Sequence, residues 1–151
     1  MTIALPTWLG FAVMLVVCSG AFIRGGVEER LTAASMLINV SATHVLRDHS
    51  WPQVQLAGFV ADILSLALLL AIALRSRKFW PLAATAFQFL IVLTHVAKVI
   101  DPGLGQWSYM TAIVIWTYLL LIALGVGVWN CWRASPYALS GEVAGRADTR
   151  R

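Results

Sequence analysis

Apolar positions along the chain fall into five runs, separated by short polar stretches. Four of the runs have about 20 residues or more, the length that an α-helix needs to cross a hydrocarbon core of about 30 Å. Prolines and tryptophans gather at the ends of the runs, as is typical of membrane helices whose aromatic rings lie at headgroup level. The pattern predicts an all-α integral membrane protein, a bundle of five transmembrane helices. The runs cover residues 4–23, 31–46, 54–74, 80–100 and 107–129.

The second run is shorter than the others. Its 16 residues, LTAASMLINVSATHVL, reach only about 24 Å at the helical rise per residue. Arg30 and Arg47 flank the run, and their long side chains can extend to the headgroups and cover the shortfall. We therefore expect a short second span.

The basic residues predict how the bundle is oriented. If all five runs span and the N-terminus is outside, nine of the 11 Lys and Arg residues lie on the cytoplasmic side and two outside. If the second run does not span and the N-terminus is inside, the division is seven to four. Cytoplasmic loops carry the excess of Lys and Arg. The count therefore favours an outside N-terminus, five spans and a cytoplasmic C-terminus.

The composition changes after Trp132. The segment RASPYALSGEVAGRADTRR is small, polar and basic at its tip, and such a segment cannot bury a hydrophobic core. We therefore expect a transmembrane bundle over residues 1–132 and a disordered, basic cytoplasmic tail over residues 133–151.

The overall composition supports a membrane location and excludes several other classes. Hydrophobic residues make up 60% of the chain and charged residues 12%, against about 45–50% and about 25% in soluble domains. The sequence pI is near 9.6, but the basic residues form no stripe, so nucleic acid is not an expected partner. The chain has the general look of small bacterial inner-membrane proteins. The expected partners are the lipid bilayer and either another membrane protein or a second copy of the chain.

One ionisable residue lies deep within an apolar run. Asp62 lies about 12 Å below the outer end of the third run, by helical rise. A carboxylate near the centre of a membrane helix costs about 2.5–3.5 kcal/mol, so it needs a partner or a proton. Asn39 and His95 lie at similar depths, about 10 Å and about 7 Å. We expect these side chains to meet in the outer half of the bundle, with an Asp62–His95 hydrogen bond or ion pair.

Helical spacing extends this expected cluster and gives it a mouth. Residues 35, 39 and 43 recur every four positions in the second run, and residues 88, 95 and 98 share one face of the fourth. The predicted intramembrane polar cluster consists of Asp62, His95, Asn39, Gln88 and Thr43. The predicted outer mouth consists of His44, Lys98 and Asp101.

Several functions are compatible with such a cluster. It can act purely as a structural hydrogen-bonding network between helices, worth about 0.6 kcal/mol per pair. It can form a binding site in a small binding or accessory subunit, for a ligand such as a quinone head group. Asp62 and His95 can instead relay protons or cations. A third alternative is a b-type haem held by His44 and His95 as axial ligands.

Enzyme motifs are missing from the sequence. It contains no glycine-rich phosphate loop, no HExxH and no Ser/His/Asp order typical of a hydrolase. The two cysteines, Cys18 and Cys131, have no metal-binding or disulfide-framework spacing. We therefore predict no catalytic residues, and no metal ligands other than the two histidines of the haem alternative.

Overall fold

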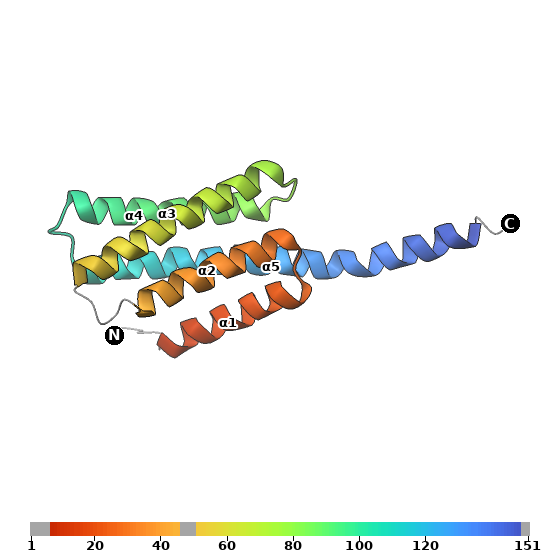
Figure 1. The fold of residues 1–151 in the computed structure, drawn as a ribbon, viewed down its shortest axis with the longest axis horizontal. Helices are drawn as coiled ribbons and strands as arrows, with labels where there is room; N and C mark the ends of the chain where they lie inside the picture. Colours follow the sequence, from red (N-terminus) through yellow and green to blue (C-terminus); the bar gives the residue numbers. More distant parts are fainter. Residues whose placement is uncertain (1–6, 46–50, 149–151) are drawn as a thin grey trace.

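A computed structural model describes residues 7–45 and 51–148 of the 151-residue chain. Side chains are described for residues 10–42, 56, 58–134. In these ranges the chain forms five α-helices and no strand (Figure 1). The helices are α1 (Thr7–Arg24), α2 (Val27–Val45), α3 (Trp51–Arg75), α4 (Trp80–Ile100) and α5 (Gln106–Asp148).

The helices pack side by side in one bundle, and consecutive helices are antiparallel (Figure 1). Helix α4 lies between α3 and α5, α2 packs on α3, and α1 closes the bundle against α2 and α5. The α1–α2 and α3–α4 connections lie at one end of the bundle, and the α4–α5 connection lies at the other (Figure 1). Residues of different helices can therefore meet at two levels, one near each end.

Three helices in the described ranges are long and apolar enough to cross a membrane. They are Gly58–Arg75, Trp80–Ile100 and Gln106–Ala134, and α1 adds a shorter apolar stretch. Large apolar side chains point away from the bundle, for example Ile23 and Leu74, which are 74% and 79% exposed. An apolar surface of this kind is covered by lipid or by a partner protein. The prediction of an all-helical membrane protein is confirmed at this level.

Helix α2 begins four residues before the expected run, at Val27, and has 19 residues. Its first turn carries Glu28 and Glu29, which suit a helix N-terminus because they complement the helix dipole. These charges are also why α2 is less apolar than the three candidate spans. The expected start of this element at residue 31 is therefore too late.

A buried carboxylate joins three helices at the end that carries the α1–α2 connection. Glu29 has no solvent-exposed surface. Its Oε1 accepts hydrogen bonds from Lys78 Nζ at 2.9 Å, Trp80 Nε1 at 3.1 Å and Cys131 Sγ at 3.3 Å. Burial lowers the pKa of the Lys78 amine, but its bonds to Glu29 and Glu28 raise that pKa well above the ordinary value. Lys78 therefore stays charged, and the cluster ties α2, the α3–α4 connection and α5 together.

Trp80 has a different role from the one its position in the sequence indicates. The aromatic pattern places it at headgroup level, yet it is only 3% exposed. The indole N–H is satisfied by the Glu29 carboxylate, and the ring packs against Gly127 of α5. A buried partner for the N–H removes the need for interfacial water.

Helix α5 continues to Asp148 and projects beyond the bundle as one helix (Figure 1). Residues 133–148 of the expected disordered tail belong to this helix, and residues 149–151 lie outside the described ranges. The division of the chain into a bundle over residues 1–132 and a disordered tail stays a prediction. Extending an existing helix avoids the cost of nucleation. The tail also contains good helix formers such as alanine, leucine, glutamate and arginine.

The close contact between α5 and Trp80 predicts opposite outcomes for two glycines of α5. A Cβ at Gly127 would lie 2.8–2.9 Å from three indole atoms of Trp80, whereas a Cβ at Gly125 would meet no atom within 4 Å. We expect Gly127→Ala to lower the free energy of unfolding by about 1–3 kcal/mol through overpacking. Gly125→Ala should be neutral or stabilising, because alanine favours the helix. Thermal unfolding in detergent measures both, and equal effects of the two substitutions would contradict this packing.

Candidate functional site

Asp62 lies on the buried face of α3. Its side chain is buried, with 7% of its surface exposed. Ser65 and Leu69 on the same face are also buried, at 8% and 1% exposed. Residues on the opposite face, such as Val60 and Leu64, are exposed. The helix therefore turns its carboxylate towards the other helices, away from the hydrocarbon side, as the insertion cost of a charge requires.

Three side chains from two neighbouring helices donate to the Asp62 carboxylate. Asn39 Nδ2 of α2 lies 2.6 Å from Oδ1. Gln88 Nε2 of α4 lies 2.9 Å from Oδ1 and 3.2 Å from the Asp62 backbone oxygen. His95 Nε2, also of α4, lies 3.0 Å from Oδ2. Hydrogen bonds to an ionised carboxylate are stronger than those between neutral groups, so this arrangement offsets much of the cost of burial.

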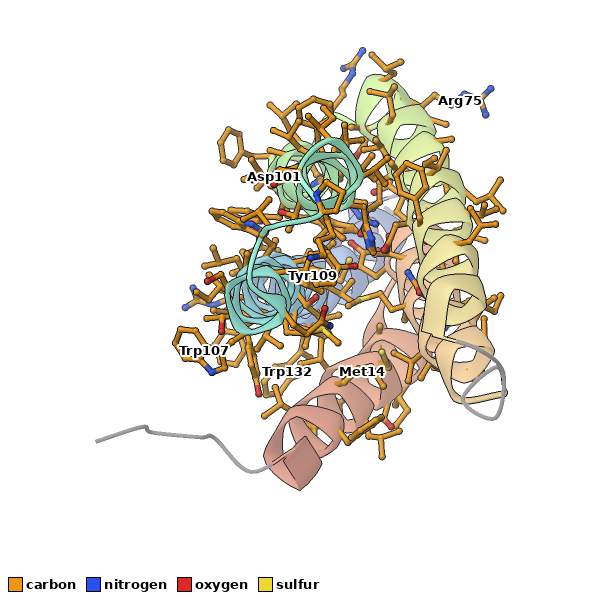
Figure 2. The ribbon with its side chains drawn as sticks, turned by 90° about the vertical axis from the view of Figure 1, so that its left-hand side faces the viewer. Met14, Arg75, Asp101, Trp107, Tyr109 and Trp132 are labelled. Carbon is orange, nitrogen blue, oxygen red and sulfur yellow. The ribbon has the colours of Figure 1, made fainter. Side chains whose placement is uncertain are left out.

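Tyr109 of α5 extends the network from His95. Its hydroxyl lies 2.9 Å from His95 Nδ1, and the two rings meet edge to face at 5.6 Å. Tyr109 is 5% exposed, in contrast to Trp107 at 74%. Figure 2 looks along the bundle and shows Tyr109 in its middle and Trp107 on its outside. The chain Tyr109–His95–Asp62 therefore crosses from α5 through α4 to α3.

A cavity of about 290 Å³ adjoins this network. Helices α2, α3, α4 and α5 each contribute several residues to its lining, and α1 contributes Met14. The cavity is lined by Met14, Met36, Asn39, Val40, Gly58, Asp62, Ser65, Gln88, Ile91, His95, Tyr109, Met110, Ile113, Thr117 and Leu120.

The structure brings together four of the five residues of the predicted cluster. Asp62, His95, Asn39 and Gln88 form one hydrogen-bonded group. The side chain of the fifth, Thr43, lies outside the described part of the chain.

Two of the three residues predicted for the outer mouth, Lys98 and Asp101, have described side chains, and neither bonds to the Asp62 network. Lys98 Nζ donates to the backbone oxygens of Pro102 and Leu104, and Asp101 Oδ1 accepts from the Gly103 N–H at 2.9 Å. Both side chains therefore shape the α4–α5 connection. The side chain of His44 lies outside the described residues.

Two residues of the polar networks, Tyr109 and Glu29, are not predicted from the sequence. Tyr109 lies at the edge of an apolar run, where an aromatic ring is expected to face the headgroups. Its signal is its spacing: residues 109, 113, 117 and 120 recur at helical intervals, and all line the cavity. Glu29 was assigned to a connection, because the helix begins earlier than its apolar run.

The haem alternative conflicts with the bonds of His95. Both ring nitrogens are engaged, Nε2 with Asp62 and Nδ1 with Tyr109, so axial ligation would break one of these bonds. Among the side chains that the structure describes, no group of three or more His, Cys, Asp or Glu residues is placed to hold a metal ion. The geometry of His95 therefore suits a hydrogen-bonding role.

Comparisons with protein-family models, with curated proteins and with solved structures find no match. The chemistry of the site is therefore argued from its own geometry. That geometry combines a buried carboxylate, a polarised histidine–tyrosine pair and unfilled space beside them.

The bond between Tyr109 and His95 predicts a difference between two tyrosines of α5. We expect Tyr109→Phe to lower the free energy of unfolding by about 0.5–1.5 kcal/mol, because it removes one buried hydrogen bond. Tyr118→Phe is the matched control, since no hydrogen bond of the Tyr118 hydroxyl is found among the described residues. Unfolding of both variants in detergent, together with ¹⁵N NMR of the His95 ring, provides the measurement. Unchanged His95 resonances in Tyr109→Phe would contradict the contact.

Proposed function

We propose that the protein is a multi-pass inner-membrane protein whose interior cavity binds a small ligand, as a binding or accessory subunit. In this proposal all five helices cross the membrane, α2 being the shortest apolar span, with the N-terminus outside and the C-terminus cytoplasmic. The observation that carries the binding function is the cavity of about 290 Å³ in direct contact with Asp62, His95 and Tyr109.

The distribution of charge over the two ends of the bundle supports this orientation. The end with the α1–α2 and α3–α4 connections carries most of the basic residues, and the α4–α5 end carries Lys98. Basic residues are retained on the cytoplasmic side, so the Asp62 network would lie in the outer half of the membrane. The residues of the first end are Arg24, Arg30, Arg75, Arg77, Lys78 and Arg133.

The cavity supports a binding function over a purely structural network. Helix interiors are close-packed, and voids larger than a water molecule are few. A network that only joins helices needs no space beside it. Small-molecule sites have volumes of about 300–1,000 Å³, mostly apolar walls and a few placed polar groups. The cavity, at about 290 Å³, lies just below this range, which suits a small ligand of about one ring.

A second candidate function is a proton relay, and the unbroken Tyr109–His95–Asp62 chain favours it. The imidazole can accept a proton at Nδ1 and release one at Nε2, so it can pass a proton between the phenol and the carboxylate. Carboxylate–histidine chains of this kind occur in proton pathways through membranes. In this reading the cavity supplies water to the chain.

Cysteine labelling tests the proposed orientation. In a background with Cys18→Ala and Cys131→Ser, Gln106→Cys and Ala134→Cys each introduce one exposed thiol, at the start and at the end of the apolar part of α5. We expect a membrane-impermeant maleimide to label Gln106→Cys in intact cells and Ala134→Cys only after lysis, because the two ends of the span lie on opposite sides. The reverse labelling would overturn the orientation.

A cavity-filling substitution tests the binding function. Gly58 lines the cavity one turn before Asp62, and a Cβ there would meet no atom within 4 Å. Gly58→Leu should therefore be at least as stable as the unmodified protein, yet lose ligand binding. A panel of ring-sized compounds, including a quinone without its isoprenoid tail, is screened by the rise of the unfolding temperature with ligand concentration.

The matched control is Gly125→Leu, which adds the same side chain at an open position outside the cavity lining. A compound that stabilises the protein and Gly125→Leu, but not Gly58→Leu, supports binding in the cavity. If no compound does so, and proteoliposomes show proton flux that Asp62→Asn abolishes, the relay replaces the binding function.

A further inference from the structure

The cavity has one strongly charged group. Of its 15 lining residues, three are ionisable, namely Asp62, His95 and Tyr109, and none is Lys or Arg. Two basic side chains at the ends of α4 bond other groups: Lys98 bonds the α4–α5 connection and Lys78 bonds Glu28 and Glu29. No protein cation therefore balances the Asp62 carboxylate from within the cavity walls.

The hydrogen bonds of the Tyr109–His95–Asp62 network indicate which atoms carry its protons. Tyr109 is buried, and His95 Nδ1 is the one acceptor within hydrogen-bond distance of its hydroxyl among the described residues. The Tyr109 hydroxyl donates to Nδ1 in the state in which Nδ1 carries no proton. Nε2 then carries the imidazole proton and donates it to Asp62 Oδ2. In this state His95 is neutral, Asp62 is ionised, and the network has a net charge of −1.

The network also has more acceptor capacity than donor capacity left for a ligand. A carboxylate offers about four lone-pair positions, and Asp62 uses three of them, two on Oδ1 and one on Oδ2. The N–H groups of Gln88 and His95 are already directed at Asp62. A ligand that donates a hydrogen bond is therefore matched to the open position on the Asp62 carboxylate.

The remaining walls require an apolar body. Thioethers and branched aliphatic side chains also line the cavity. Methionine side chains adapt well to irregular hydrophobic ligands. Hard inorganic cations need six or more oxygen ligands or retained waters, which these walls do not supply. The wall residues are Met14, Met36, Val40, Ile91, Ile113 and Leu120.

We propose that the ligand of the cavity is a hydrophobic monovalent organic cation, a protonated amine on a body of about one ring, with Asp62 as its counter-ion. This inference rests on the proposed binding function and specifies its ligand class. The ammonium N–H fills the open acceptor position of the carboxylate, and the apolar body fills the methionine-lined part of the cavity. Binding then neutralises a charge that the protein otherwise stabilises by hydrogen bonds alone.

A pair of probes of nearly equal shape tests the role of charge. Phenethylammonium and 2-phenylethanol are titrated into the purified full-length protein in a nonionic detergent, and dissociation constants are measured by calorimetry. We expect the cation to bind at least about tenfold more tightly than the alcohol, because hydrogen bonds to charged groups are worth more than neutral ones. Asp62→Asn should abolish this preference while leaving the weaker binding of the alcohol.

Asp101→Asn is the matched control, since Asp101 is exposed in the α4–α5 connection and does not line the cavity. It should retain the preference for the cation. If Asp62→Asn does not fold, the ratio of the two dissociation constants in the unmodified protein decides alone.

The outcomes separate this inference from the proposed function. Equal affinity for cation and alcohol, with both lost in Gly58→Leu, overturns the ligand class and leaves the binding function in place. A preference for the cation that persists in Asp62→Asn places the counter-ion elsewhere and also overturns the inference. If neither probe nor any compound of the panel binds, both proposals fail.

Discussion

The fold depends on the need of one buried carboxylate for hydrogen-bond donors. Asp62 can lie inside the bundle only if other helices supply donors at its depth. Helix α2 supplies Asn39 and α4 supplies Gln88 and His95, and His95 in turn holds Tyr109 of α5. A single acidic residue thereby sets the relative height and rotation of four helices. Hydrophobic packing alone would not set them so strictly, because lipid contacts are as favourable as contacts between apolar helices.

Two buried carboxylates, Glu29 and Asp62, hold helix α2 in position. It carries Glu29 at one end of the bundle and Asn39 towards the other, and it contacts α1, α3 and α5. Its polar residues make it the least suited of the helices to face lipid on all sides. Bonds to Trp80 and Lys78 at one level and to Asp62 at the other turn those residues inwards. The helix that is poorest in apolar residues is therefore the one most bound by polar contacts.

Sequence reasoning reaches part of this arrangement, for physical reasons. The helical rise gives the depth of a residue, and the helical period gives the face on which it lies. Asp62, His95 and Asn39 can therefore be assigned to one level, and Gln88 to the same helix face as His95, before any packing is known. Neither rule tells a buried ring from an interfacial one, and both Trp80 and Tyr109 lie at run ends, where the interface is the usual place. The position of Glu29 within a helix could not be predicted, because hydropathy does not show that a charged residue belongs to the first turn of a helix. The cavity depends on how side-chain volumes fit together, which periodicity does not contain.

The two carboxylate oxygens of Asp62 have different kinds of hydrogen-bond partner. Oδ1 accepts from both amides, Asn39 and Gln88, groups that do not titrate and that hold the carboxylate in place whatever else changes. Among the described residues, Oδ2 accepts from His95 alone, and imidazole is the side chain that most often acts as a proton donor and acceptor in proteins. A ligand or a proton can therefore act on the Oδ2 side without releasing the bonds that join α2, α3 and α4. A network built only for stability has no need of this separation, whereas a binding site that must survive repeated occupation and release does.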